Sequence, residues 1–435
     1  MSKKRIEKIL FSEKDKKVYF QNNNVSAINN NTENALIFNA KKLGSGGTGK
    51  VYKIPHGAYP IPIAIKRYSD KVLSENGAAI DSYLRSLIVF RKNMTDDIRR
   101  KIDKFTVWPQ RLVYDYDTDE ICGFTMHLIP EQFFTSINIA GEDEKKESNL
   151  DFVLHGAKFR KKYGLPLLSA KGRAKIVYDF LSTVSMLHNN DYILGDLSPK
   201  NLLIAVDKSN QSKNRILFID TDSYRKRGSV HPLQQLHTPD WIPPECQKAS
   251  VELSKLTPNA NPSLLSRLKV DMFIQNQYTD VYKVCLAIIR LYHDGDHASI
   301  ITSSYSADKK LRTNISDEFA NYILQGLSDL PKARPSINDL LTSFVNSVNA
   351  KLKAPEISKL EAMIDIGDEE AMYNLGIAYA RGNGVAIDKH KAQMLLYKAY
   401  LRGNIEAIFA LVDLFDNPPE HFINEAVKHG YVGAK

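Results

Sequence analysis

The stretch YILGDLSPKNLLIA, Tyr192–Ala205, sets a few polar residues in an apolar frame. Asp196 is followed five residues later by Asn201, and the run LLIA after it is typical of a buried strand. Taken singly, Asp196 is more simply a residue that caps backbone groups, and Asn201 a turn residue. The meaning of the stretch therefore depends on what precedes and follows it in the chain.

A glycine-rich turn lies upstream, in GSGGTGKVY. Gly44, Gly46 and Gly49 form a GxGxxG pattern between two runs of strand character. Residues without a Cβ let backbone N–H groups approach phosphates. A dinucleotide-binding loop would be followed by a helix, whereas KVYKI is typical of a strand. Farther on, IAIK places Lys66 on an apolar strand, where its charge is costly to bury unless an anion receives it.

Further motifs follow the opening stretch. In chain order they are ILFIDTD with Asp220 and Asp222, TPDWIPPE with Glu245, YTDVYKV with Asp280, and LPKARPS with Arg334. Together with the glycine-rich turn and Lys66, this order resembles the signature set of protein kinases. The loop LGDLSPKN is similar to that of bacterial protein-kinase-like proteins of the Hanks type. The resemblance covers residues 36–351.

The resemblance implies a role for each matching residue. Asp196 would accept the hydrogen bond of a substrate hydroxyl, and Asn201 and Asp220 would hold magnesium. Glu245 would pair with Arg334, and Asp280 would cap the backbone of the catalytic loop. The nucleotide would be bound by Gly44, Ser45, Gly46, Gly47, Gly49, Val51, Ala64 and Lys66.

The catalytic loop departs from the kinase pattern in two places. Leu194 and Gly195 replace the usual histidine and arginine. Leu194 is expected to fill the packing position, while the lost arginine removes the counter-charge for a phosphorylated activation loop. Ser198 stands where many serine/threonine kinases have a lysine. Lys200 either neutralises charge that develops on the γ-phosphate or is a solvent-facing loop lysine.

The metal-binding motif and the partner of Lys66 also depart from the pattern. DFG is replaced by Asp220, Thr221 and Asp222. Asp220 is expected to be the principal ligand because it directly follows the strand. Asp222 is either a second metal ligand or a side chain that hydrogen-bonds a nearby backbone turn. The acidic residue that should pair with Lys66 from the first helix is not evident, and Glu75 and Asp81 are the candidates.

Patterning along the kinase-like region predicts an α+β fold. Short β-prone runs follow one another from residue 36 to a hairpin that ends near Pro130. Beyond it, Ser169–His188 and Val281–Tyr292 have apolar residues at helical spacing. We therefore expect a bilobal protein-kinase-like fold over 36–351, with a β-rich N-lobe and a helical C-lobe. Residues 1–35, which include QNNNVSAINNNTEN, are expected to form a flexible arm.

The last part of the chain, 355–435, contains a repeat. EAMYNL at Glu370 and EAIFAL at Glu406 begin 36 residues apart, a period typical of stacked helical hairpins. The residues from Leu375 to Gly403 resemble a Sel-one-type repeat, a relative of the tetratricopeptide unit. A short all-α solenoid is predicted, which either binds a protein partner or packs on the kinase C-lobe.

Composition narrows the classes of function. The 435 residues carry a net charge of +9, but the basic clusters are scattered and match no nucleic-acid module, so no specific nucleic-acid partner is expected. Three distant cysteines predict neither disulfides nor a zinc site and suit the cytoplasm. The apolar run Val281–Tyr292 is too short for a bilayer and contains Lys283 and Arg290, so no membrane span is expected.

The combined prediction is a protein kinase that uses ATP and Mg to phosphorylate serine or threonine of protein substrates. Its catalytic residues would be Lys66, Asp196 and Lys200, and its metal residues Asn201, Asp220 and Asp222. Two alternatives stay open. The missing helix glutamate and the altered DFG favour a pseudokinase scaffold. A kinase-fold enzyme that transfers AMP, or that uses a non-protein acceptor, is the other.

Overall fold

The computed structural model describes residues 6–22, 36–55, 62–139, 142–257, 260–293, 305–349, 354–415, 418–429 and 431. One eight-stranded sheet forms the N-terminal lobe, with the hydrogen-bonded order β3-β2-β1-β7-β8-β6-β5-β4. Its strands are β1 (Ile6–Ser12), β2 (Lys17–Asn22), β3 (Leu36–Asn39), β4 (Lys41–Ser45), β5 (Gly49–Lys53), β6 (Ile63–Tyr68), β7 (Arg111–Asp115) and β8 (Ile121–His127).

The sheet curls back on itself. β3 and β4 end the strand order at opposite edges, yet only Ala40 separates them in the chain. The N–H of Ala40 donates to the carbonyl oxygen of Lys16, in the turn after β1. The curled sheet encloses an apolar core that includes Ile9, Phe11, Val18, Phe20, Tyr52, Ile65, Val113 and Cys122.

The prediction of a flexible arm over residues 1–35 is wrong for Ile6–Asn22, which form β1 and β2. Apolar residues are consecutive in both strands, at Ile9–Phe11 and at Val18–Phe20, and all six side chains are buried. β1 also pairs in parallel with β7. The hydrophobic energy of this buried face outweighs the entropy of ordering the segment. Residues 23–35, most of the asparagine-rich stretch, lie outside the described residues.

The predicted meander and hairpin are confirmed with one difference. β4, β5 and β6 pair antiparallel in sequence, as do β7 and β8. The run ALIFNAKKL was expected to be one strand, but it is split at Ala40 into β3 and β4. The split allows β3 to pair with β2 while β4 pairs with β5.

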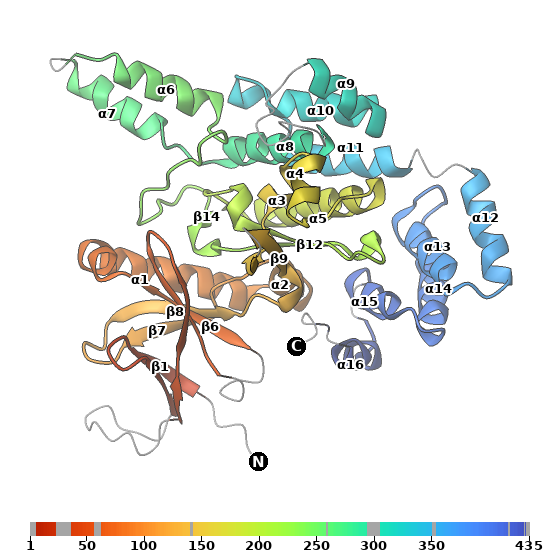
Figure 1. Ribbon diagram of the computed structural model, residues 1–435, viewed down its shortest axis with the longest axis horizontal. Helices are drawn as coiled ribbons and strands as arrows, with labels where there is room; N and C mark the ends of the chain where they lie inside the picture. The colour runs from red at the N-terminus through yellow and green to blue at the C-terminus, as the bar shows by residue number, and fades with distance from the viewer. Residues whose placement is uncertain are drawn as a thin grey trace.

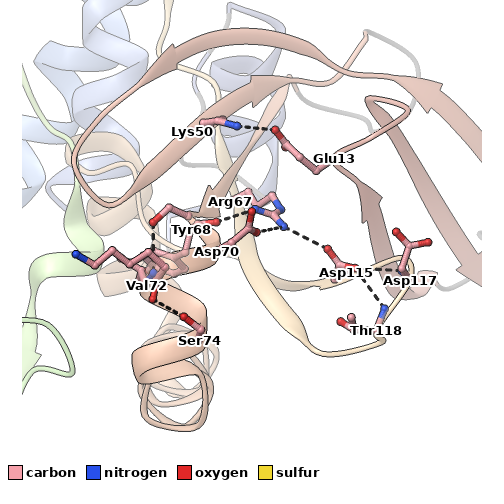
Figure 2. Close-up of polar contacts among 12 residues, drawn as sticks. Glu13, Lys50, Arg67, Tyr68, Asp70, Val72, Ser74, Asp115, Asp117 and Thr118 are labelled. Atoms are coloured by element: carbon pink, nitrogen blue, oxygen red, sulfur yellow. Dashed lines mark hydrogen bonds and ion pairs between the residues drawn. The ribbon is translucent and has the colours of Figure 1, made fainter.

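Arg67, the residue after Lys66, fixes the end of β6. Its guanidinium donates to Asp70 Oδ1 at 2.7 Å and to Asp115 Oδ2 at 3.4 Å (Figure 2). Asp70 begins α1 (Asp70–Asn93), and Asp115 ends β7. The strand that carries Lys66 is thereby tied both to the first helix and to the end of β7, which lies two strands away in the sheet.

A helical lobe follows the sheet, as predicted, so the α+β class with a β-rich lobe, a helical lobe and further helices is confirmed (Figure 1). α8 (Gln277–His293) is central, since every residue from Thr279 to Tyr292 is buried. The other helices are α2 (Asp96–Phe105), α3 (Leu150–Leu154), α4 (Ala157–Lys162), α5 (Ala170–Asn189), α6 (Pro244–Ser254), α7 (Pro262–Asp271), α9 (Tyr305–Asn314), α10 (Asp317–Gly326) and α11 (Ile337–Asn349). Short strand pairs lie among them: β9 (Phe134–Ile139) with β10 (Glu142–Glu147), β11 (Tyr192–Ile193) with β14 (Arg225–Lys226), and β12 (Leu202–Ala205) with β13 (Arg215–Phe218).

The C-terminal segment forms stacked helices, blue in Figure 1. They are α12 (Ala354–Asp365), α13 (Glu369–Arg381), α14 (Lys389–Leu401), α15 (Ile405–Asp413) and α16 (Glu420–Lys428). The two copies of the repeated sequence correspond to α13 and α15. Consecutive helices pack on one another around their own apolar core. The predicted helical hairpins are therefore present.

The helical tail packs on the rest of the protein. Asp413 forms an ion pair with Lys104 of α2, and Arg215 lies 3.9 Å from Glu406. The guanidinium of Arg381 stands 4.5 Å from the centre of the Tyr178 ring. Of the two roles expected for the tail, packing against the preceding lobe is thus observed.

Two further sequence expectations concern the whole chain. None of the helices in the described ranges is long and apolar enough to cross a membrane. The thiols of Cys122, Cys246 and Cys285 are all free and buried.

Glu13 joins the N-terminal hairpin to the strand that follows the glycine turn. It lies in the turn between β1 and β2 and accepts hydrogen bonds from Lys50 Nζ at 2.8 Å and Tyr52 Oη at 2.7 Å. The contact with Lys50 is drawn in Figure 2. Burial acts to raise the pKa of Glu13, but hydrogen bonds from Lys50, Lys16 and Tyr52 outweigh it and lower the pKa to about 2.

We expect Glu13→Gln to lower the free energy of unfolding at pH 7 by about 1–2 kcal/mol, because an ionised, hydrogen-bonded carboxylate is lost. The folded-state pKa lies below the ordinary 4.5, so this stability is complete above pH 4.5 and is lost as the pH falls toward 2. Urea denaturation of wild type and variant should therefore converge in acid. Glu252→Gln, at an exposed site on α6, is the control and should change little. A difference that stays constant down to pH 2 would contradict this role of Glu13.

Candidate active site

The loop between β11 and β12 carries Asp196 and Asn201, and α8 holds its start. Leu194 is fully buried in the main core of the helical lobe, which confirms its predicted packing role. Asp280 Oδ2 accepts the backbone N–H of Leu194 at 2.9 Å and lies 3.1 Å from His188 Nε2. The predicted cap of this loop by Asp280 is therefore confirmed.

Gly195 adopts a conformation that explains the missing arginine. Its φ of +67° lies in the left-handed region that favours glycine. A Cβ at this position would lie 2.5 Å from Gln235 Oε1 and 3.0 Å from the carbonyl oxygen of Ser223. Any side chain here would therefore collide with the segment from Asp220 to Glu245, which we call the activation segment.

The activation segment contacts the loop through Ser223 and through β14. Ser223 Oγ donates to the Leu194 carbonyl at 3.3 Å. β14, which contains Arg225, pairs with β11 immediately before the loop. Within the segment, Gln235 Nε2 donates to the Ser223 carbonyl at 2.6 Å, and Gln235 Oε1 accepts from Arg225 at 2.8 Å. The segment is thus joined to the loop by strand pairing and by a side-chain hydrogen bond.

Asp196 and Asn201 lie together and are tied to the strand that leads to Asp220. Asn201 Nδ2 donates to Asp196 Oδ2 at 3.1 Å and to the Asp196 carbonyl at 2.8 Å. The carbonyl of Asn201 accepts the N–H of Ile219 at 3.0 Å. Burial raises the pKa of Asp196 above 3.8, although Lys283 and Asn201 act in the opposite direction. A raised pKa makes this carboxylate a better proton acceptor.

Lys283 lies beneath the loop and is a residue that the sequence reasoning missed. It is fully buried on α8, and its Nζ donates to the Gly195 carbonyl at 3.0 Å and to Gln275 Oε1 at 3.2 Å. Burial lowers the pKa of Lys283, while Asp280 and Asp196 raise it. The sequence does show Lys283 among apolar residues at helical spacing. We interpreted it only as an interruption of the apolar run and did not predict its contact with the loop.

Lys66 pairs with both carboxylates of the motif Asp220–Asp222. Its Nζ lies 2.8 Å from Asp222 Oδ1 and 3.1 Å from Asp220 Oδ1. The two acids differ in exposure: the side chain of Asp222 is 8% exposed and that of Asp220 is 51% exposed. Burial acts to lower the pKa of Lys66, but Asp222 and Asp220 outweigh it and raise the pKa above its usual value. The lysine is therefore charged and paired inside the protein.

Tyrosines and a histidine hold Asp222 from the other sides. Tyr68 Oη donates to Asp222 Oδ2 at 2.9 Å. The single proton of Tyr83 Oη is shared between the carbonyl oxygens of Tyr224 and Asp222, the latter at 3.0 Å. His231 Nε2 also lies 2.9 Å from that carbonyl. Burial, followed by Asp222, raises the pKa of Tyr68, so its hydroxyl keeps the proton that it donates. Both carboxylate oxygens of Asp222 thus have partners, as does its backbone oxygen.

The partner of Lys66 does not come from the first helix, which corrects the choice between Glu75 and Asp81. Glu75 is exposed, and Asp81 pairs with Arg85 one turn along α1. The helix contributes Tyr83 instead, through its bond to the backbone of Asp222. The sequence did not reveal this partner because two residues replace the expected acidic residue of the helix. Asp222 supplies the charge, and Tyr83 supplies the contact from the helix.

The glycine turn joins β4 and β5. Packing requires glycine at only one of the turn's glycine positions, as the space around each shows. A Cβ on Gly49 would lie 2.1 Å from the carbonyl oxygen of Arg67, so glycine is required there by strand packing. Cβ atoms on Gly44, Gly46 and Gly47 would have no neighbour within 4 Å. The exposed Ser45 belongs to the same turn. Val51 and Ala64 lie on the adjacent strands β5 and β6, where Val51 is directly opposite Lys66.

Two other predicted residues have clear positions. Lys200 is exposed within the short helical turn Pro199–Asn201, a position compatible with either of its expected roles. Glu245 forms a two-pronged ion pair with Arg334, at 2.9 Å and 2.6 Å. Since Arg334 is only 4% exposed, the predicted buried pair at the end of the activation segment is confirmed.

No protein-family model matches the chain, and no curated protein matches it. Similar solved structures include two variants of the PknI kinase domain of Mycobacterium tuberculosis, a single and a double mutant. Each is 13% identical in sequence to this chain and has a TM-score of 0.41. Each match covers 71% of this chain. It covers 93% of the single mutant's kinase domain and 95% of the double mutant's. A similarity of this extent carries no conclusion about function.

We expect Gly195→Ala to destabilise the protein by about 2–3 kcal/mol, because it combines the left-handed backbone cost with a collision against Gln235 and Ser223. Gly228→Ala is the matched control, since Gly228 also has a positive φ but an open surrounding, and it should cost about 1 kcal/mol. Chemical denaturation measures both. Equal losses in the two variants would show that Gly195 is not closely packed.

We expect Asp222→Asn to lower the free energy of unfolding by about 2–3 kcal/mol, because it removes one partner of a buried ion pair and leaves Lys66 to Asp220 alone. Asp81→Asn breaks a more exposed pair and should cost less than about 0.5 kcal/mol. Urea denaturation at neutral pH compares the two. A loss no larger for Asp222 than for Asp81 would mean that the buried contact contributes nothing.

Proposed function

We propose that the protein is a serine/threonine protein kinase that transfers the γ-phosphate of ATP with Mg. One observation supports this proposal above the others, the connected arrangement of four polar residues. Lys66 contacts Asp220, Ile219 before it is bonded to the backbone of Asn201, and Asn201 is bonded to Asp196. Phosphoryl transfer requires mainly positioning and charge neutralisation, for which these residue types are suited.

The residues near Lys66 fit magnesium and a nucleotide. Mg²⁺ prefers oxygen ligands and is usually bound by one or two carboxylates together with substrate phosphates. Asp220 offers a half-exposed carboxylate, and Asn201 has its amide oxygen available while its Nδ2 is engaged with Asp196. Across the described ranges no group of three or more His, Cys, Asp and Glu could hold a metal. Binding would therefore rely on the phosphates, next to the open glycine turn.

Of the three metal residues predicted, we keep Asn201 and Asp220 and assign Asp222 to Lys66. Bound ATP with Mg supplies the phosphoryl group and part of the charge neutralisation. Lys66 is the cation that would orient the phosphates, and Asp222 keeps its ammonium group in place when Asp220 turns to the metal. Asp222, held by Tyr68 and Tyr83, would thus act as the positioning residue that a helix glutamate usually provides.

Asp196 would accept the proton of the attacking serine or threonine hydroxyl. Its raised pKa and its hydrogen bond from Asn201 suit a positioned base. Exposed Lys200, four residues away in the same loop, would neutralise charge that develops on the phosphoryl group. Lys200 is exposed, so the loop that carries Asp196 can be reached by a serine or threonine hydroxyl on the surface of another protein. We therefore propose that the substrates are proteins. The buried free cysteines fit the cytoplasm expected from the sequence.

A scaffold function is favoured by a different observation. Lys66 is already paired with two carboxylates, so a nucleotide phosphate must compete with Asp220 for it. If that exchange does not occur, the protein would present its surfaces to partners without phosphate transfer.

With Mg and ATP labelled in the γ-phosphate, wild type should transfer label to itself or to an added protein substrate. Asp196→Ala should lower the rate by about 10²–10⁴-fold because the base is lost. Asp220→Ala should abolish transfer at the Mg concentration that saturates wild type, because a carboxylate ligand of the metal is lost. The rate should also fall as the pH drops through the pKa of Asp196, since the protonated carboxyl cannot accept a proton. Intact mass distinguishes a gained phosphate from a gained AMP.

Asp329→Ala, at an exposed surface pair with Lys248, is the control and should keep the wild-type rate. Transfer that survives Asp196→Ala would contradict the assigned base. ATP binding without transfer, equal in wild type and Asp196→Ala, would support the scaffold instead. Absence of both binding and transfer would exclude the kinase and leave the scaffold.

A further inference from the structure

A cavity of about 280 Å³ lies between the kinase-like region and the helical tail. Its walls come from α5 and the start of β13 on one side, and from α13 and α15 on the other. In Figure 1 the green end of the β12–β13 hairpin points toward these blue helices. The volume is near the lower end of the range for small-molecule sites, roughly 300–1,000 Å³, which occur preferentially at domain interfaces. None of the residues of the candidate active site lines it.

The lining carries an excess of positive charge. Six basic and three acidic side chains contribute to it. The acids are each matched by one base: Asp413 with Lys104, Asp179 with Lys175, and Glu406 with Arg215. Within the described part of the chain, no carboxylate forms an ion pair with Lys171, Lys213 or Arg381. A cavity with three surplus cations attracts an anion.

Some of the described residues that line the cavity carry buried polar atoms without hydrogen-bond partners. Among the described residues, Asn214 Nδ2, Arg381 Nε and Asn383 Oδ1 are buried and have no hydrogen-bond partner, and all three residues line the cavity. Asn214 is fully buried and begins the connection into β13. Leaving such a group without a partner destabilises the protein. Two of the three atoms are donors, which suits an anionic oxygen acceptor.

Aromatic and apolar side chains form the rest of the wall. Tyr178, Tyr373 and Phe409 line the cavity, and the guanidinium of Arg381 already lies over the Tyr178 ring. Such a lining accepts the flat, apolar part of a ligand beside its charged part. The residues on both walls are therefore complementary to a molecule that joins a phosphate to a ring.

We propose that this cavity binds a phosphorylated small molecule no larger than a mononucleotide, which holds the tail against the kinase-like region. The surplus cations receive the phosphate, Lys171 and Lys213 from one wall and Arg381 from the other. The ring lies against Tyr178 and Tyr373. Ligand and tail docking are then linked, because only the docked tail completes the binding site.

Lysine footprinting of the full chain tests this with AMP and inorganic pyrophosphate as probes. Each probe is added, surface lysines are acylated, and modification is mapped by mass spectrometry. We expect at least fivefold protection of Lys171 and Lys213, and none of Lys269 and Lys332, which are exposed elsewhere. Protection by AMP at lower concentration than by pyrophosphate is expected if the ring contributes. Since no catalysis is measured, the result is independent of whether the protein transfers phosphate.

Calorimetry of the double variant Lys171→Glu/Lys213→Glu completes the test, with Lys269→Glu/Lys332→Glu as the charge-matched control. The cavity variant should bind AMP at least tenfold more weakly at this site, and the control should bind as wild type. Failure of both probes to protect either lysine, or equal protection of all four, would overturn the proposal and leave only water in the cavity. Equal weakening in both double variants would indicate a general effect of net charge and would overturn it as well.

Discussion

The buried charge of Lys66 is the constraint on which the arrangement of the candidate site depends. An ammonium group on a fully buried strand must be compensated, since an isolated ion in the protein interior is very costly. Asp222 provides that compensation from the activation segment, with Asp220 beside it. Tyr68 and Tyr83 then fix Asp222 in turn, so the charge draws β6, α1 and the activation segment to one point. Arg67, the next residue along the strand, ties the same region to the N-terminus of α1 and the end of β7.

The acidic partner of Lys66 lies in the activation segment. The resemblance to kinases implied a partner on the first helix instead. A helix glutamate would make the pair depend on the position of α1. Here the pair depends on the activation segment, which pairs with β11 through β14 and contacts the loop through Ser223. Because Gly195 has no side chain, Ser223 and Gln235 of the segment can lie close to the loop.

Local pattern predicted much of this fold, and the rest required tertiary information. The β4–β8 strands follow from β-prone runs bounded by turns, and α5, α8 and the helical tail follow from helical spacing and the repeat. The Asp280 cap and the Glu245–Arg334 pair were implied by the resemblance to protein kinases. β1 and β2 were missed because an asparagine-rich stretch near them dominated the prediction, although Ile9–Phe11 and Val18–Phe20 are apolar runs whose residues are all buried. The partner of Lys66 was out of reach, since Asp222 is 156 residues away and no spacing rule links them. Lys283 could be seen as a charge in an apolar helix, but its contact with Gly195 needed the packing of α8.

A structure of the protein with magnesium and a non-hydrolysable ATP analogue tests the central claim most directly, that Asp222 rather than an acid of α1 positions Lys66. The account predicts that Lys66 Nζ stays within hydrogen-bond distance of Asp222 while Asp220 turns to the metal beside Asn201. Tyr68 and Tyr83 should keep their bonds to Asp222. A structure in which α1 moves so that Glu75 or Asp81 pairs with Lys66, with Asp222 released to the metal or to solvent, would contradict it.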